Sequence, residues 1–100
     1  MELFHRRMVT IVTESALERD LIAELEGMGV RGFTISDVRG KGSRGTRRAE
    51  WAQEGNIRIE VVCEQAAADR IAERVRDRYY DHYAMIVFVQ DVSVLRPEKF

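Results

Sequence analysis

The sequence predicts an α+β domain of the ferredoxin-like class, a βαββαβ plait, and three observations support this. Four β-branched, apolar runs recur along the chain, and two segments with helical apolar spacing lie between them. Their order is strand, helix, strand, loop, strand, helix, strand, which is the plait order. The length of 100 residues allows one hydrophobic core and leaves no room for a second. We therefore expect a single domain over residues 1–100.

The first strand is predicted over Met8–Val12, reaching back to about Leu3, because this run is apolar and β-branched. A helix is expected to follow. Ser15 and Glu18 have the spacing of a capping box, in which each side chain bonds a free backbone N–H of the first turn. The apolar face of this helix has residues at helical spacing, namely Leu17, Leu21, Ile22, Leu25 and Met28.

Glycines mark the end of this helix, and two further strands are expected after it. Gly27 and Gly29 can adopt the positive φ that terminates a helix. The second strand is predicted over about Gly32–Arg39 and the third over Asn56–Cys63, where apolar and charged residues alternate. Between them, residues from about 40 to 55 lack apolar periodicity and are expected to form a long loop.

The second half of the chain repeats the helix–strand pattern. A helix is predicted from about Gln65 to Tyr80 and the last strand over Ala84–Val92, followed by a short tail that contains Pro97. The buried stripe of the helix comprises Ala68, Ile71, Ala72, Val75 and Tyr79.

The first and last strands are apolar on both faces, which a lone plait does not require. Its two helices cover one face of the sheet and leave the other in water, so strands should alternate. The runs Met8–Val12 and Ala84–Val89 do not. Self-association over the open face is the simplest explanation, and the alternative is that these strands are merely hydrophobic.

The composition excludes several classes of protein. A net charge of −1 argues against a general nucleic-acid binder. Residues 1–7 are too polar for a signal peptide, and the longest apolar run, Ala84–Val89, is far too short to span a membrane. The single cysteine, Cys63, allows no intrachain disulfide and fits a reducing compartment. A cytoplasmic protein without membrane insertion is expected.

The loop between the second and third strands is the main candidate for a binding function. Residues 39–48 contain five cationic side chains and three glycines, together with the hydroxyls of Ser43 and Thr46. Glycine lets backbone N–H groups approach an anion, and Lys and Arg neutralise its charge. The loop joins two strands and matches no Walker pattern, so P-loop mechanics do not apply. It is a plausible phosphate cradle, and the alternative is a solvated hairpin connection.

The remaining reactive residue types suggest no chemistry. His5 and His82 lack partners at metal-ligand spacing, and Cys63 is most simply a small core residue. Trp51 in the polar loop either packs on its own domain or binds a partner. No nucleophile–base–acid set can be assembled, so the protein is expected not to be an enzyme and to hold no metal or cofactor, although slow nucleotide hydrolysis is left open.

The chain resembles the PII superfamily of signalling proteins, and more narrowly its SbtB and carboxysome-associated PII (CPII) group. The resemblance covers about residues 8–95, and the run from Gly40 to Arg44 is its most diagnostic part. The matching segments are 9–14, 32–34, 40–44, 56–60 and 80–84.

This resemblance implies a trimeric PII-like assembly that binds nucleotides in the clefts between subunits. The expected ligand is an adenine nucleotide, ADP or AMP, with ATP and cyclic AMP as further candidates. Thr34 would lie near the adenine, and Tyr83 and Ala84 would help to form the opposite wall from a neighbouring subunit. The residues that would hold phosphates are Gly40, Lys41, Gly42, Ser43, Arg44 and Arg47.

The resemblance also implies a second ligand and a partner. Bicarbonate, or another small anion, would lie beside Lys41 or Arg44. The long loop would be the T-loop, which changes conformation with the ligand and binds a target through Arg47, Arg48 and Trp51. A bicarbonate transporter or a carboxysome component is the expected target, in the regulation of inorganic-carbon uptake or carboxysome-linked carbon metabolism.

The sequence departs from this group in two respects. The loop carries Arg47, Arg48, Glu50 and Trp51, which would suit a different partner, and the C-terminal residues also differ. Some SbtB proteins end in a cysteine-bearing loop linked to redox control, whereas residues 95–100 contain no cysteine. Redox behaviour is therefore not transferred to this chain.

Two other functions remain open. An RNA-binding module uses the same plait but places aromatic residues on its open sheet face, and the strand Asn56–Cys63 has none. A nucleotide-independent adaptor or structural subunit with an inert loop is the other alternative.

Overall fold

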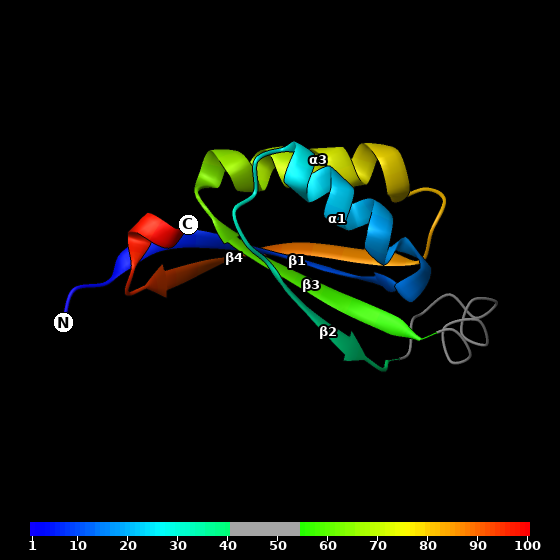
Figure 1. The fold of residues 1–100 in the computed structure, drawn as a ribbon, viewed down its shortest axis with the longest axis horizontal. Helices are drawn as coiled ribbons and strands as arrows, with labels where there is room; N and C mark the ends of the chain where they lie inside the picture. Colours follow the sequence, from blue (N-terminus) through cyan, green and yellow to red (C-terminus); the bar gives the residue numbers. More distant parts are fainter. Residues whose placement is uncertain (41–54) are drawn as a thin grey trace.

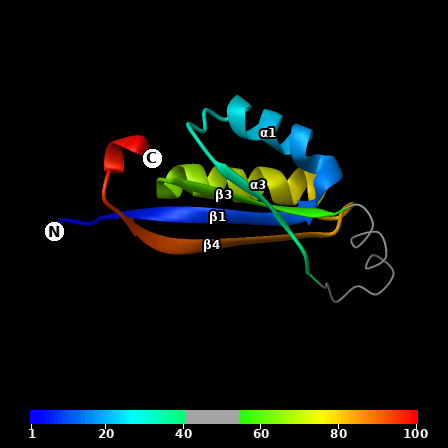
Figure 2. The same cartoon turned by 60° about the horizontal axis from the view of Figure 1, so that its bottom comes forward.

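The structure is a computed structural model that describes residues 1–40 and 55–100. These residues form a four-stranded antiparallel sheet in the order β2-β3-β1-β4, with α1 and α3 on one face (Figures 1 and 2). This confirms the predicted ferredoxin-like α+β class. The elements are β1 (Phe4–Glu14), α1 (Glu18–Gly27), β2 (Thr34–Val38), β3 (Asn56–Cys63), α3 (Gln65–Tyr79) and β4 (Met85–Val94), with short 3-10 helices at Ser15–Leu17 and Pro97–Lys99.

The core lies between the sheet and the two helices. Ile11 of the central strand is opposite Ile59 of β3 and Val87 of β4, so all three point to the helix-covered face. Apolar side chains from both helices complete this layer. The buried cluster comprises Val9, Ile11, Leu17, Leu21, Leu25, Ile57, Ile59, Val61, Cys63, Ala68, Ile71 and Val75.

The opposite face of the sheet is uncovered by described residues and carries exposed apolar side chains. Ile86 and Phe88 of β4 are 47% and 43% exposed, and they lie opposite Val12 and Thr10 of β1. The prediction that the first and last strands are apolar on both faces is thereby confirmed. Arg58 of β3 also points to this face, as its alternation with buried neighbours predicts.

The predicted capping box is wrong. Ser15 lies inside a 3-10 turn whose N-cap is Glu14, and α1 begins only at Glu18 after the N-cap Leu17. Neither N-cap side chain accepts a capping hydrogen bond from the first turn of its helix. The backbone N–H of Ser15 instead donates to the carbonyl oxygen of Gly55 at 3.2 Å, so a residue distant in sequence satisfies the donor.

The end of α1 follows the prediction. Gly29 has φ of +80°, and its N–H donates to the carbonyl of Glu26 at 3.1 Å. The N–H of Val30 donates to the carbonyl of Leu25 at 3.1 Å. These two bonds form a Schellman motif, which requires a left-handed residue at the position of Gly29.

Two strand boundaries differ from expectation. β2 begins at Thr34 rather than at Gly32, because residues 30–33 cross from the end of α1 to the sheet. β4 extends to Val94, two residues beyond the prediction, because it continues to pair with β1 as far as Phe4. None of the described helices is long and apolar enough to cross a membrane.

The sheet has two distinct ends, which Figure 1 shows at opposite sides of the molecule. We call the first the loop end: β1 finishes there, β3 and β4 begin, and β2 leads toward Gly40. The tail end is the opposite one, where α1 finishes, α3 begins and the turn Pro97–Lys99 lies.

Candidate functional site

The loop anchors, Gly40 and Gly55, lie at the loop end of the sheet. Val38 at the end of β2 pairs with Asn56 at the start of β3, so the chain leaves and returns on neighbouring strands. Gly55 has φ of +81°, a conformation that favours glycine. Its carbonyl accepts the bond from Ser15, which ties the returning chain to the start of the first helical segment.

Buried hydrogen bonds fix the turn before β4. Ala84 is only 8% exposed, and its N–H donates to Oε2 of Glu14 at 3.2 Å. Oγ1 of Thr13 donates to the carbonyl oxygen of Ala84 at 2.9 Å. Both backbone groups of Ala84 are therefore satisfied by side chains at the end of β1, which holds this turn against the central strand.

Tyr83 lies beside this turn and is exposed. Its ring centroid is 6.0 Å from that of Tyr79, within the range for an aromatic pair. The hydroxyl of Tyr79 in turn donates to Oε2 of Glu24 at 3.3 Å. Burial, and then the negative charge of Glu24, raise the pKa of Tyr79. Tyr83 is thus supported from behind by an uncharged tyrosine and presents its own ring to solvent.

Thr34 lies at the other end of β2, away from these residues. It is exposed and lies opposite Glu60 of β3. The four residue steps from Thr34 to Val38 span about 13 Å at roughly 3.3 Å each, and Gly40 lies beyond Val38. Thr34 borders an open hollow of about 410 Å³ whose lining is Arg31, Gly32, Phe33, Thr34, Glu60, Val62, Lys99 and Phe100.

The predicted site residues are therefore divided between two parts of the chain. Gly40, Tyr83 and Ala84 are at the loop end, whereas Thr34 is level with the middle of β1 and β3 and borders the hollow that the tail also lines. The predicted loop residues Lys41, Gly42, Ser43, Arg44, Arg47, Arg48 and Trp51 lie outside the described residues.

Sequence reasoning missed most of the residues around Thr34. Arg31, Glu60 and Phe100 come from the α1–β2 connection, from β3 and from the tail, and only folding brings them together. The alternation of β3 already put Glu60 on the uncovered face. No sequence pattern pointed to Arg31 or Phe100.

The described residues hold no group of three His, Cys, Asp or Glu side chains placed to bind a metal ion. His5 is exposed at the start of β1. Burial raises the pKa of Cys63, so its thiol is protonated at neutral pH. This is the behaviour of a core cysteine and not that of a reactive one.

Comparison with known proteins agrees with the fold. Residues 6–99 match the family model described as nitrogen regulatory protein P-II. A PII-like signalling protein from Thermus thermophilus is 43% identical, with a TM-score of 0.84 over 100% of this chain and 99% of that one.

A second relative was solved with ligands. CPII from Thiomonas intermedia K12, bound to ADP and bicarbonate, is 27% identical, with a TM-score of 0.85 over 99% of this chain and 97% of that one. The same protein bound to ADP, AMP and bicarbonate is 25% identical, with a TM-score of 0.81 over 99% and 100%. The resemblance to the PII superfamily and its CPII group is confirmed, and the chain belongs to the nitrogen regulatory protein P-II family.

Proposed function

We propose that this protein is a PII-like regulator that binds an adenine nucleotide between neighbouring subunits of a homotrimer. ADP or AMP is the expected ligand, with ATP and cyclic AMP as further candidates. The observation that carries the proposal is the separation of Thr34, which borders the hollow lined by the tail, from Gly40, Tyr83 and Ala84 at the loop end of the same chain.

This separation suggests how the site is divided between chains. Thr34 is about 13 Å from Val38 alone, which is more than the width of an adenine ring, so Thr34 and the loop anchors of one chain cannot both contact the same adenine. A site with both parts is complete when the loop end of one subunit meets the tail end of its neighbour. We assign Gly40 and Tyr83 to one subunit and Thr34 to the next, a different grouping from that implied by the resemblance alone.

The uncovered sheet face supports assembly. Ile86 and Phe88 are nearly half exposed on the face that the described helices leave open, and Met8 and Val12 adjoin them on β1. Contiguous exposed apolar groups of this kind typically mark a protein–protein interface. Packing this face against other copies buries them and brings neighbouring subunits edge to edge.

The cationic loop supplies the charge complementary to phosphates. Lys41, Ser43, Arg44 and Arg47 are assigned to the nucleotide phosphates, together with Gly40 and Gly42. Bicarbonate is assigned to Lys41 or Arg44, consistent with the bicarbonate-bound CPII relative.

The signalling role follows from a loop that contacts a ligand in only one of its states. Phosphate contacts made in one arrangement favour that arrangement, and the ligand thereby changes affinity for a target. Arg47, Arg48 and Trp51 are assigned to target binding. A bicarbonate transporter or a carboxysome component is the proposed target, in the control of inorganic-carbon uptake or carboxysome-linked carbon metabolism. We assign the protein to the cytoplasm, as a regulator and not an enzyme.

Calorimetric titration with ADP, AMP, ATP and cyclic AMP, with and without bicarbonate, tests this proposal. Micromolar binding of at least one nucleotide is expected, and Thr34→Ala weakens it by about tenfold through loss of a contact in the site. Ser36→Ala is the matched control, because Ser36 is exposed on the same strand but does not line the hollow. Absence of binding by every nucleotide would overturn the proposal and favour the adaptor.

A further inference from the structure

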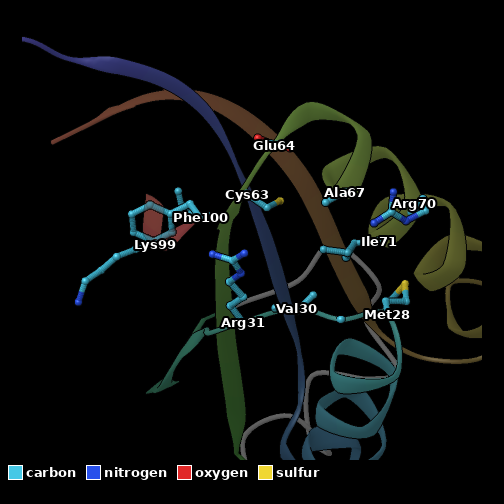
Figure 3. Close-up of a pocket in the computed structure, with 12 residues that line it drawn as sticks. Met28, Val30, Arg31, Cys63, Glu64, Ala67, Arg70, Ile71, Lys99 and Phe100 are labelled. Carbon is cyan, nitrogen blue, oxygen red and sulfur yellow. The ribbon is translucent and has the colours of Figure 1, made fainter. Parts of the chain in front are cut away.

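A second cavity at the tail end lies outside the proposed nucleotide contacts. Its volume is about 240 Å³, and it opens where α1 ends and α3 begins (Figure 3). Three segments form its walls: the turn after α1, the start of α3 with the end of β3, and the C-terminal tail. The lining residues are Met28, Gly29, Val30, Arg31, Val62, Cys63, Glu64, Ala67, Arg70, Ile71, Lys99 and Phe100.

One wall of this cavity is apolar. Ile71 is 1% exposed and Cys63 is 7% exposed, while Met28 and Ala67 are half-buried beside them. Burial keeps the Cys63 thiol protonated by raising its pKa, so it adds an uncharged, polarizable surface. An apolar wall with a few polar groups at the edge is the usual composition of a small-molecule site.

The edge of the cavity is cationic. Arg31 and Arg70 lie on either side of Ile71 (Figure 3), and neither makes an ion pair with the described residues. The only hydrogen bond of the Arg31 side chain there is from Nη1 to the carbonyl oxygen of Glu98, at 2.8 Å, which leaves its charge unneutralised. Glu64 is the one acidic side chain in the lining, and its partner at 4.0 Å is Arg6.

The charge of Arg70 extends into the cavity. Its side chain lines the cavity (Figure 3), and its charge lowers the pKa of Cys63, whereas burial and the charge of Glu64 raise it. A carboxylate held between Arg31 and Arg70 would accept charge-assisted hydrogen bonds, while the apolar part of the same molecule packs against Ile71 and Met28.

We propose that this cavity is a second ligand site, which binds a small organic carboxylate with an apolar body. The volume lies below the ~300 Å³ lower limit typical of pockets for drug-sized ligands, so the ligand is about the size of one aromatic ring with its acid group. Inorganic phosphate or bicarbonate would leave the apolar wall uncovered, and a neutral molecule would leave both arginines unpaired.

The position of the cavity predicts a regulatory effect, which rests on the nucleotide site proposed above. Four residues line both this cavity and the hollow beside Thr34: Arg31, Val62, Lys99 and Phe100. A carboxylate that bonds Arg31 shares the guanidinium with the carbonyl of Glu98, and so acts on the tail that borders both spaces. Binding of the acid is therefore coupled to binding of the nucleotide.

The test uses benzoate as the probe and benzyl alcohol as its neutral control. In a titration followed by amide chemical shifts, benzoate is expected to move residues 28–31 and 67–71, and benzyl alcohol is not. Arg70→Gln should weaken benzoate binding about tenfold through loss of a charge-assisted bond. Arg76→Gln is the matched control, because Arg76 is on the same helix but pairs with Asp77 outside the cavity.

Two further measurements separate the possible failures. Ala67→Leu fills the cavity from a helical position and should abolish benzoate binding without loss of helical content. Absence of benzoate-induced shifts in the unaltered protein, or equal shifts with benzyl alcohol, would overturn the carboxylate site.

Calorimetry of ADP with and without benzoate should show an affinity change of about fivefold. ADP that binds equally in both cases would overturn the coupling, whereas ADP that never binds would overturn only the nucleotide proposal.

Discussion

At the loop end, side chains at the end of β1 are bonded to the turn before β4, whereas at the tail end two arginine side chains hold the turn Pro97–Lys99. Thr13 and Glu14 satisfy both backbone groups of Ala84, through one buried and one partly buried hydrogen bond. At the tail turn, the side chain of Arg6 donates to the carbonyl of Pro97 at 3.1 Å, and the side chain of Arg31 donates to the carbonyl of Glu98.

This difference suggests a division of tasks. A hydrogen-bonded junction of this kind resists displacement, so the loop end can hold the anchors of a long loop in a fixed position. The tail end leaves two open spaces next to each other, and the bond from Arg31 to Glu98 beside them is exposed to water. The loop end is therefore suited to hold its share of the nucleotide site in a fixed position, and the tail end to admit ligands into its open spaces.

The largest expected effect of a single substitution is at Thr13. Thr13→Val preserves the shape but leaves the carbonyl of Ala84 without its donor, which should lower the free energy of unfolding by about 1–3 kcal/mol. Urea unfolding at a fixed protein concentration measures this loss.

Thr10→Val is the control for Thr13→Val. Thr10 is on the same strand and equally buried, but its Oγ1 has no hydrogen-bond partner among the described residues. Its removal should leave the stability unchanged or raise it slightly. Equal losses at Thr10 and Thr13 would show that the buried bond does not distinguish the loop end.

A smaller effect is expected at the glycine that ends the loop. Gly55→Ala places an alanine at a position of positive φ, and its new Cβ lies 3.2 Å from Oγ of Ser15. The cost should be about 1–2 kcal/mol in unfolding free energy. Gly32→Ala at the tail end meets no atom within 4 Å and should change stability by at most about 0.5 kcal/mol. Thermal or urea unfolding that ranks the two variants the other way would contradict the comparison.

The smallest effect is a pH dependence at the tail end. Because burial raises the pKa of Cys63 in the folded state, its contribution to stability is complete below the usual thiol pKa. It is lost as the pH rises through the folded value. Urea midpoints between about pH 7 and pH 10 should therefore fall more steeply for the unaltered protein than for Cys63→Ala. Parallel pH profiles of the urea midpoint for the two proteins would show that the cavity wall does not shield the Cys63 thiol from water.

The element order was predictable because hydrophobic periodicity is local. The alternation of residues 56–63 and the helical stripe of α3 each identify an element without knowledge of the rest of the chain. The Schellman end at Gly29 was predictable for the same reason, since positive φ is a property of one residue. The capping box failed because the carbonyl of Gly55, distant in sequence from Ser15, took the place of a local cap.

The candidate site was predictable only where it depended on consecutive residues. The cationic loop and the turn at Tyr83 and Ala84 are continuous in sequence. The hollow beside Thr34 and the carboxylate cavity combine residues from about positions 28–34, 60–71 and 99–100, which only tertiary packing brings together. No periodicity encodes such a convergence, and the separation of Thr34 from Gly40, Tyr83 and Ala84 emerged only from the folded chain.

Subunit complementation tests the central claim, that one nucleotide site needs the loop end of one chain and the tail end of another. Arg44→Ala alters the first half and Thr34→Trp blocks the second, and each variant alone should bind ADP poorly. Mixed oligomers, formed by refolding the two variants together, should regain ADP sites of normal affinity wherever two unaltered halves meet. ADP binding that stays as weak in the mixture as in the separate variants would contradict the claim and place the whole site within one chain.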